Sequence, residues 1–233
     1  MPMTLKTDLE GKVKEIYGTQ WTRRNGQTVP DQDDLKLSND AIDLSITILY
    51  ADLTASTDLV DNYRDWYASE NYKTFLHCAT KIIRSHDGYI RSYDGDRVMG
   101  VFIGDMQNTR AVKVGLKINW AVKYIINPAK KAVYPSCEYV MKHVVGIDTS
   151  NVMAIRPGIR GSNDIAWIGR SANHAAKLSS MDASYPTWIT DSVYNVLADE
   201  AKYSNGKHMW EARVWSSMNN RKIYRSNYWW PIV

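Results

Sequence analysis

Leu44 to Leu53 reads LSITILYADL, an apolar run that ends in an acidic residue. Its β-branched and large apolar side chains predict a buried strand. Side chains alternate between the two faces of a strand, so Ile48, Tyr50 and Asp52 share one face. A carboxylate at the end of an apolar strand is costly to desolvate unless a positive charge meets it. Asp52 is therefore the first candidate functional residue.

A second acidic residue follows a turn signal in Tyr89 to Phe102 (YIRSYDGDRVMGVF). The pair Asp94-Gly95 predicts a two-residue hairpin turn of the type I′ class, with Asp96 just after it. One helix length separates Asp96 from Asp52. Two converging carboxylates repel each other, and a divalent cation is the usual remedy. The pattern indicates a metal-dependent site for a phosphate-bearing substrate.

The composition is that of an ordinary soluble globular protein, with 44% apolar and 23% charged residues. The net charge of +4 is too small and too dispersed to indicate nucleic-acid binding. The two cysteines, Cys78 and Cys137, lack the paired spacing of a zinc site and suit a reduced compartment. The N-terminus is charged from Lys6 onward, unlike a signal peptide, and no apolar run approaches the roughly 20 residues of a membrane helix. We expect a cytoplasmic protein with no nucleic-acid or membrane partner.

Residues 1–40 are expected to form a helical extension and a linker, and residues 41–233 the main domain. The apolar residues near the N-terminus recur at helical spacing: Leu5, Leu9, Val13 and Ile16. They predict a short amphipathic helix over Met1 to Tyr17, packed on the body or on a partner protomer. Asn25 to Asp40 is polar and contains Pro30, which predicts a loop or linker.

The main domain alternates between predicted helices and strands. A long helix is expected to begin at Ser56 or Thr57 and to end near Ser85, and a second to span Asn108–Ile126 and to end before Pro128. The other predicted elements are a strand over Glu138–Thr149 with a hairpin mate over Asn151–Arg156, a helix over Ser171–Ser180, a strand over Trp188–Thr190, a helix over Ser192–Ala201, and a closing hairpin of Met209–Ser217 with Ile223–Tyr228. This order predicts an α+β fold, with a mostly antiparallel sheet covered by helices on one face in a ferredoxin-like arrangement.

Four stretches resemble the class III nucleotidyl cyclase family, and the resemblance covers about Ser45 to Tyr228. They are YADLTAST (Tyr50–Thr57), SYDGDRVMGVF (Ser92–Phe102), GIDTSNVMA (Gly146–Ala154) and GRSANHAAKL (Gly169–Leu178). The first two look like the family's metal-binding segments. The last looks like its helix in which a basic residue follows an asparagine four residues later. The order and spacing of the four make the resemblance specific.

The resemblance implies a catalytic domain that pairs head to tail in a homodimer. One protomer would supply Asp52, Asp96 and the backbone carbonyl of Leu53 to two divalent cations, Mn²⁺ or Mg²⁺. The other would supply Asn173 and Lys177, which share one helix face because they are four residues apart. The substrate's own 3′-hydroxyl would attack the α-phosphorus, releasing pyrophosphate and a 3′,5′-cyclic nucleotide.

The chain departs from the family at Lys177, where the family usually has arginine. Lysine keeps the charge but loses the bidentate fork, so either Lys177 is a point charge or another residue contacts the phosphates. Arg221 or Lys222 is the alternative, although both also fit a solvated surface. Asn173 can equally cap or brace its helix. A degenerate, nucleotide-binding homologue without activity is therefore one alternative function.

The positions that read the base in purine cyclases of this family hold Ser92 and Ala166 here. Adenylate cyclases typically have lysine at the first and aspartate or threonine at the second. Guanylate cyclases typically have glutamate and a small polar residue. Neither purine pair is present, although Asp164 could substitute for Ala166 after a loop shift.

Arg97 and Tyr50 favour a smaller base. The predicted turn places Ser92 opposite Arg97, whose donors suit the carbonyl oxygens of uracil, and Tyr50 would narrow the pocket. These departures resemble the bacterial pyrimidine (uridylate) cyclases of Pycsar anti-phage systems, which make cyclic UMP or cyclic CMP and are encoded beside an effector that the product activates. We expect conversion of UTP to cyclic UMP, which signals to a separate effector. Cytidylate or adenylate cyclase activity is the alternative.

Overall fold

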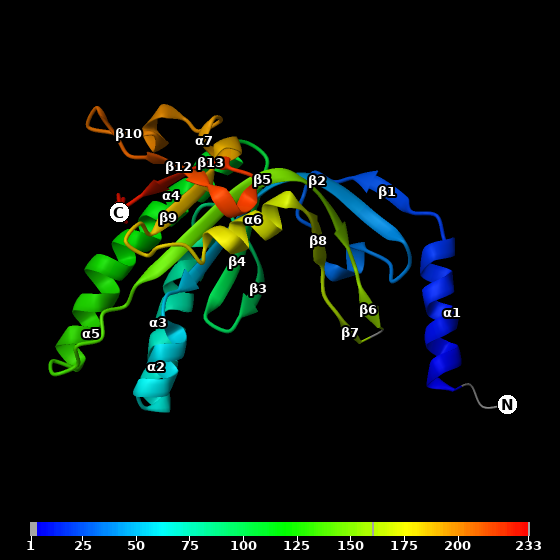
Figure 1. Cartoon of the computed structure of the whole chain (residues 1–233), viewed down its shortest axis with the longest axis horizontal. Helices are drawn as coiled ribbons and strands as arrows, with labels where there is room; N and C mark the ends of the chain where they lie inside the picture. The colour runs from blue at the N-terminus through cyan, green and yellow to red at the C-terminus, as the bar shows by residue number, and fades with distance from the viewer. Residues whose placement is uncertain (1–3, 160, 233) are drawn as a thin grey trace.

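A nine-stranded, mostly antiparallel sheet forms the centre of the fold (Figure 1). The computed structural model describes residues 4–159 and 161–232. The strands of the sheet are β1 (Thr22–Asn25), β2 (Asp40–Leu53), β3 (Tyr89–Asp94), β4 (Arg97–Ile103), β5 (His143–Ile155), β8 (Ala166–Gly169), β9 (Thr187–Thr190), β12 (Glu211–Trp215) and β13 (Arg221–Ser226). They are ordered β12-β13-β9-β5-β2-β4-β3, with β1 added to β2 and β8 added to β5. Two short hairpins stand apart, β6 (Gly158–Ile159) with β7 (Ser162–Asn163) and β10 (Tyr203–Ser204) with β11 (Lys207–His208).

Helices connect the strands and cover the sheet. They are α1 (Leu5–Gly18), α2 (Ser56–Asn62), α3 (Asp65–Arg84), α4 (Gln107–Ala121), the π-helical turn η2 (Val122–Ile126), α5 (Asn127–Val133), α6 (Arg170–Leu178) and α7 (Asp191–Tyr194), with 3-10 turns η1 (Gln32–Asp34), η3 (Asp199–Ala201) and η4 (Ser216–Met218). The α+β class predicted from the sequence is confirmed.

The sheet has a hydrophobic core on each face. On one face Leu49 of β2 belongs to the same core as Phe75 of α3 and Leu116 of α4. On the other face Ile48 belongs to the same core as Ala175 of α6. The prediction that helices cover only one face is therefore wrong. Successive side chains of β2 point to opposite faces of the sheet, and the side chains on both faces are apolar. Both faces must therefore be buried against other elements.

Two helices differ in extent from the prediction. The helix expected from Ser56 to Ser85 is interrupted, because Tyr63 and Arg64 are extended between α2 and α3. The helix expected to end before Pro128 instead continues through η2 into α5. Pro128 lies in the first turn of α5, where its missing N–H does little harm.

The strand β5 is one continuous element and not a hairpin. Its polar centre, which resembled a turn in the sequence, is hydrogen-bonded to the neighbouring strand. Thr47 donates its hydroxyl to Thr149 at 3.1 Å, and Thr149 donates to the carbonyl of Ile46 at 3.1 Å. The actual antiparallel partners of Val152 to Ile155 are Ala166 to Gly169 of β8.

The N-terminal helix α1 extends away from the sheet (Figure 1). None of its residues is buried, and its predicted apolar residues Leu5 and Leu9 are 75% and 53% exposed. The side-chain amide of Asn39 donates to the carbonyls of Ile16 and Thr19, both at 2.7 Å, and anchors its C-terminal end. The sequence analysis expected this helix to pack either on the body of the domain or on a partner protomer. The first of these two arrangements is not observed. Within the described residues, no helix has the length and apolar character needed to cross a membrane.

Candidate active site

Asp52 and the β3–β4 hairpin meet at one edge of the sheet. Asp52 lies directly opposite Arg97 in the antiparallel pair of β2 and β4. Asp96 lies in the turn that immediately precedes Arg97, beside Gly95, whose φ is +60°. The two aspartates predicted from the sequence are therefore close in the fold.

The hairpin register differs from the prediction. The turn is centred on Gly95 and Asp96, so Arg97 pairs with Asp94 and Ser92 pairs with Met99. A bulge between Ile90 and Ser92 accompanies this shift. Because only Gly95 has a positive φ, the turn has the backbone pattern of type II′ and not of type I′. The predicted pairing of Ser92 with Arg97 is wrong.

Asp52 is half-buried, and its environment disfavours the charged form. Burial and, to a lesser extent, the negative charge of Asp96 raise its pKa to about 6, and the positive charge of Arg97 opposes both effects. The influence of Asp96 means that the two carboxylates lie within electrostatic range of each other. A cation between them would relieve both the repulsion and the desolvation.

The donor set fits a cation that is held partly by its substrate. In the described part of the chain, no group of three or more His, Cys, Asp and Glu side chains could enclose a metal ion. Asp52 and Asp96 provide two carboxylates, and the backbone of Leu53 follows Asp52 at the end of β2. Mg²⁺ sites commonly combine one or two carboxylates with substrate phosphates and water. The residues present therefore fit a nucleotide-dependent metal site.

Arg97 and Tyr50 form the wall beside the two carboxylates. The Arg97 guanidinium donates to Asp94 at 2.6 Å and lies 5.1 Å from the centre of the Tyr50 ring. Its Nε is buried and has no hydrogen-bond partner within residues 4–159 and 161–232. Tyr50 donates its hydroxyl to Met99 Sδ at 3.2 Å, and burial raises the pKa of Tyr50. The wall thus holds a planar aromatic surface and an unused N–H donor.

Asn173 and Lys177 are exposed on the outer side of α6. Its inner side is buried and consists of Ser171, His174, Ala175 and Leu178. Lys177 approaches Met218 Sδ at 3.4 Å. Lys177 and Arg97 line one open cavity of about 570 Å³, together with Trp215 and Met218. The structure therefore brings a basic residue of α6 close to Arg97 within one chain.

Ala166 lies far from this cavity in the same chain. It pairs with Ile155 of β5, which in turn pairs with Ala41 near the start of β2. Asp52 is eleven residues along β2, or about 35 Å at roughly 3.3 Å per residue. Asp164 stays within its own loop and accepts from the backbone N–H of Ile165 at 2.7 Å. Ala166 therefore lies near the opposite end of β2 from Asp52.

Arg221 and Lys222 have separate environments. Arg221 Nη1 is 3.5 Å from His174 Nδ1, so Arg221 reaches α6. Lys222 is exposed and lies 5.1 Å from the centre of the Tyr224 ring. Of the two, Arg221 is the one that faces the helix with Asn173.

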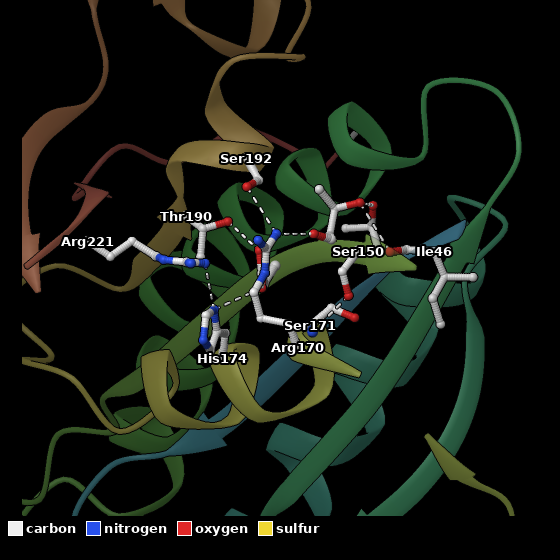
Figure 2. Close-up of polar contacts among 11 residues, drawn as sticks. Ile46, Ser150, Arg170, Ser171, His174, Thr190, Ser192 and Arg221 are labelled. Atoms are coloured by element: carbon white, nitrogen blue, oxygen red, sulfur yellow. Dashed lines mark hydrogen bonds and ion pairs between the residues drawn. The ribbon is translucent and has the colours of Figure 1, made fainter. Parts of the chain in front are cut away.

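The sequence analysis missed a buried carboxylate beneath α6. Asp148 of β5 is fully buried and interacts with Arg170, His174 and Thr190. Figure 2 shows the side chains of Arg170 and His174, both from α6, with Thr190 above His174. The argument applied to Asp52, a carboxylate within an apolar strand, also applies to Asp148 in VVGIDTS and could have found it.

Comparisons with known proteins agree with the predicted family. No protein-family model matches the chain. A uridylate cyclase from Xanthomonas perforans is 50% identical over 231 residues, which cover 99% of this chain and 100% of the relative. A uridylate cyclase from Burkholderia cepacia is 47% identical over 232 residues, with 99% and 100% covered. One from Rhodovulum sp. (strain MB263) is 35% identical over 234 residues, with 97% and 98% covered.

Solved structures of other nucleotidyl cyclases share the fold. The adenylyl cyclase CyaB from P. aeruginosa superposes with a TM-score of 0.66 at 19% identity, covering 80% of this chain and 95% of that chain. The guanylyl cyclase Cya2 superposes with a TM-score of 0.66 at 18% identity, covering 79% and 92%. Because these relatives are 35–50% identical over nearly the whole length, the chain belongs to the uridylate cyclase family, and its fold is that of the adenylyl and guanylyl cyclases.

Proposed function

We propose that the chain converts UTP to 3′,5′-cyclic UMP and pyrophosphate. The observation that carries this proposal is the convergence of two carboxylates, Asp52 at the end of β2 and Asp96 in the β3–β4 turn, beside Arg97. The raised pKa of Asp52 agrees with a site that lacks a positive charge between the two carboxylates. The names of the full-length relatives support uridylate as the product. The O3′–Pα bond forms, the bond from Pα to the bridging oxygen of pyrophosphate breaks, and the proton of the 3′-hydroxyl leaves.

Asp52, Asp96 and the carbonyl of Leu53 would hold two divalent cations, Mn²⁺ or Mg²⁺. When bound, these cations would supply positive charge to the attacking and leaving oxygens of the in-line displacement. The role of the protein is then to fix the carboxylates and to position the nucleotide.

The base would bind against Tyr50 and Arg97. Tyr50 offers an aromatic face, and Arg97 Nε is a buried donor with no partner among the residues that the structure describes. Uracil presents carbonyl acceptors at O2 and O4, which suit the N–H donors of a guanidinium. Ser92 and Ala166 complete our proposed pocket, with Ala166 supplied by the second protomer because its own chain places it far away.

The complete site would form in a head-to-tail homodimer. One protomer would provide the two carboxylates, and its partner would provide Asn173 to the ribose and Lys177 to the phosphates. The exposure of both side chains on the outer face of α6 supports this arrangement. Class III relatives share the fold of the domain, which places α6 on the same face as Asp52.

A product assay tests the substrate. Purified protein with Mn²⁺ is incubated separately with UTP, CTP, ATP and GTP, and the products are identified by mass spectrometry. We expect cyclic UMP as the main product, and Asp52→Ala and Asp96→Ala should each abolish it while the fold survives. Turnover of CTP in preference to UTP would refute the uridylate assignment, and turnover of ATP in preference to UTP would refute the pyrimidine assignment. Nucleotide binding without any product would indicate a degenerate homologue.

A mixing experiment tests the shared site. Asp52→Ala and Asn173→Ala proteins should each be inactive alone. When they are mixed, one of the two sites in a heterodimer keeps every required group, so part of the activity should return. If each single variant is inactive and their mixture recovers no activity, the whole site lies within one chain.

The product would act as a second messenger in anti-phage defence in the cytoplasm. The resemblance to Pycsar cyclases supports this role, since they signal to a separate effector. Cells that carry the cyclase with the effector encoded beside it should show fewer phage plaques than cells with the Asp52→Ala enzyme. Equal plaque counts would overturn the defence role and leave the chemistry intact.

A further inference from the structure

The inner side of α6 is held by one buried carboxylate. Asp148 has no exposed surface and lies on β5 beneath the helix. Its Oδ2 is 3.1 Å from Arg170 Nε and 3.1 Å from His174 Nδ1, and its Oδ1 accepts from the Thr190 hydroxyl at 2.5 Å. A buried carboxylate is tolerated only when it is paired and hydrogen-bonded in this way. Both oxygens of Asp148 are therefore committed to neighbouring elements.

Arg170 connects the start of α6 to β5 at a second point and to α7. Its Nη2 donates to the carbonyl of Thr149 at 2.7 Å and to the hydroxyl of Ser192 at 3.0 Å (Figure 2). The positive end of the helix dipole disfavours a cation in the first helical turn. An arginine at this position therefore does not stabilise α6 through the helix dipole. Its contact with Asp148 compensates for the unfavourable position in the first turn.

His174 is the second link between α6 and Asp148. With a proton on Nδ1, it donates to Asp148, and burial lowers the pKa of His174. Its ring centre is 5.4 Å from that of Trp215, and Nη1 of Arg221 lies 3.5 Å from the same Nδ1 atom (Figure 2). His174 directly precedes Ala175 in the buried face and directly follows Asn173. A movement of His174 would therefore move Asn173.

We propose that Asp148 is a positioning residue for nucleotidyl transfer, which sets the place of Asn173 and Lys177 by fixing α6 through Arg170 and His174. This inference rests on the proposed function of Asn173 and Lys177. Asp148 itself touches no substrate. A helix is stiff over two turns, so an anchor on its inner side fixes the two exposed side chains on its outer side. Displacements of about 1 Å at such groups can reduce the rate about 100-fold.

Two substitutions separate the geometry of Asp148 from its charge. In Asp148→Asn the amide oxygen can face Arg170 and His174, while its NH₂ faces Thr190, whose hydroxyl can also accept. We expect Asp148→Asn to retain kcat within about tenfold. Asp148→Ala loses every contact and should lower kcat for UTP about 100-fold, with a smaller change in KM because transition-state contacts are lost.

Mixing with two site variants supplies a readout that a merely structural role would not give. Asp148→Ala keeps its own carboxylate pair but has a misplaced α6. It should therefore recover activity with Asp52→Ala, which contributes an intact α6, and not with Asn173→Ala, whose α6 is also defective. The reference mixture of Asp52→Ala with Asn173→Ala must first recover activity. Given that recovery, the positioning role is overturned if Asp148→Ala recovers activity with both variants, or if it recovers activity with neither.

A matched control accounts for lost stability. Asn119 of α4 donates to the carbonyl of Tyr228 at 2.8 Å, on the sheet face opposite α6. Asn119→Ala should lower stability and leave kcat unchanged. Amide hydrogen exchange across residues 170–178 should be faster in Asp148→Ala than in Asn119→Ala. Equal exchange would overturn the positioning role.

The failures of the two proposals can be told apart. If the wild-type protein makes no cyclic nucleotide, the proposed function fails. If the reference pair does not recover on mixing, only the shared site fails. In either case the exchange comparison alone decides whether Asp148 positions α6.

Discussion

Asp52 of β2 lies directly opposite Arg97 of β4, and Arg97 lies opposite Asp94 of β3. The guanidinium of Arg97 thus lies between the half-buried carboxylate of Asp52 and the exposed carboxylate of Asp94. It forms an ion pair with Asp94 at 2.6 Å and only partly offsets the burial and repulsion that raise the pKa of Asp52. The pocket therefore combines a basic wall with an acidic edge, as recognition of a nucleotide and its cations requires.

Removing the charge of Asp52 should stabilise the metal-free protein. Its folded-state pKa of about 6 exceeds the ordinary value, so ionisation destabilises the fold as pH rises from about 4 to 6, and the effect is complete above that range. The rise in the pKa of Asp52 from 3.8 to about 6 corresponds to roughly 3 kcal/mol of unfolding free energy. Solvent screening of this half-buried group reduces that to about 1 kcal/mol. Asp52→Asn should therefore raise the urea unfolding free energy by about 1 kcal/mol at pH 7.5 in EDTA and by nothing at pH 3.5.

The exposed Asp58 in the first turn of α2 provides the control for this change. Asp58→Asn should give no such gain. Mn²⁺ should stabilise the wild-type protein and Asp58→Asn, and it should have a much smaller effect on Asp52→Asn. Equal stability of wild type and Asp52→Asn at pH 7.5 would contradict the electrostatic account.

Arg97 should set the pH at which the site binds metal. Its charge lowers the pKa of Asp52, so Arg97→Gln should raise that pKa further and make protons compete with metal up to a higher pH. The measurement is the Mn²⁺-induced rise in melting temperature from pH 5 to pH 8. Its midpoint should move upward in Arg97→Gln and stay in place in Arg97→Lys, which keeps the charge. An unchanged midpoint in Arg97→Gln would show that Asp52 does not sense Arg97.

His143 should limit stability in acid. It is fully buried at the start of β5, and burial lowers its pKa to about 3. The unfolded state then takes up a proton below about pH 6.5 while the folded state does not, so stability falls as pH drops. Between pH 7 and pH 5 this group alone should remove about 2 kcal/mol. His143→Leu should reduce the acid sensitivity of the urea unfolding free energy by that amount.

The exposed His77 of α3 is the matched comparison for His143. His77→Leu should keep the acid sensitivity of the wild type. Identical pH profiles for His143→Leu and the wild-type protein would mean that His143 is protonated in the fold.

Gly146 should be irreplaceable beneath α6. A Cβ there would lie 2.2 Å from the carbonyl oxygen of Ala175 and 2.4 Å from the amide nitrogen of Ser179. Both contacts are backbone, so Gly146→Ala must displace the helix. We expect a loss of about 1–3 kcal/mol in unfolding free energy and a fall in cyclase activity of about 100-fold.

Gly11 in the exposed helix α1 gives the corresponding control. A Cβ there meets nothing within 4 Å, so Gly11→Ala should be neutral or slightly stabilising. Unchanged activity in a folded Gly146→Ala protein would contradict the close packing of α6 on β5.

Much of the site could be predicted from local sequence. The apolar run before Asp52 predicted a strand because its side chains fit a buried sheet, and alternation alone placed Tyr50 on the same face. The asparagine and lysine spacing predicted one helix face, and the structure exposes Asn173 and Lys177 together. These inferences use interactions within a few residues of the chain, which the sequence encodes directly.

The base-facing wall could not be predicted in the same way. A bulge and a turn shifted by one residue pair Ser92 with Met99 in place of Arg97. The two possible turns, Asp94-Gly95 and Gly95-Asp96, both consist of residues that favour turns. Local preference therefore did not fix the register. The competition between them is decided by the pairing of β4 with β2 along its whole length.

The sequence by itself determined the α+β class, the acidic edge at Asp52 and Asp96, and the membership of the cyclase family. Only the tertiary structure decided that α6 covers the second face of the sheet and that Asp148, remote in sequence, holds Arg170 and His174. Strand and helix patterns follow from short-range periodicity. The burial of one charge against another depends on which distant segments the completed fold brings together.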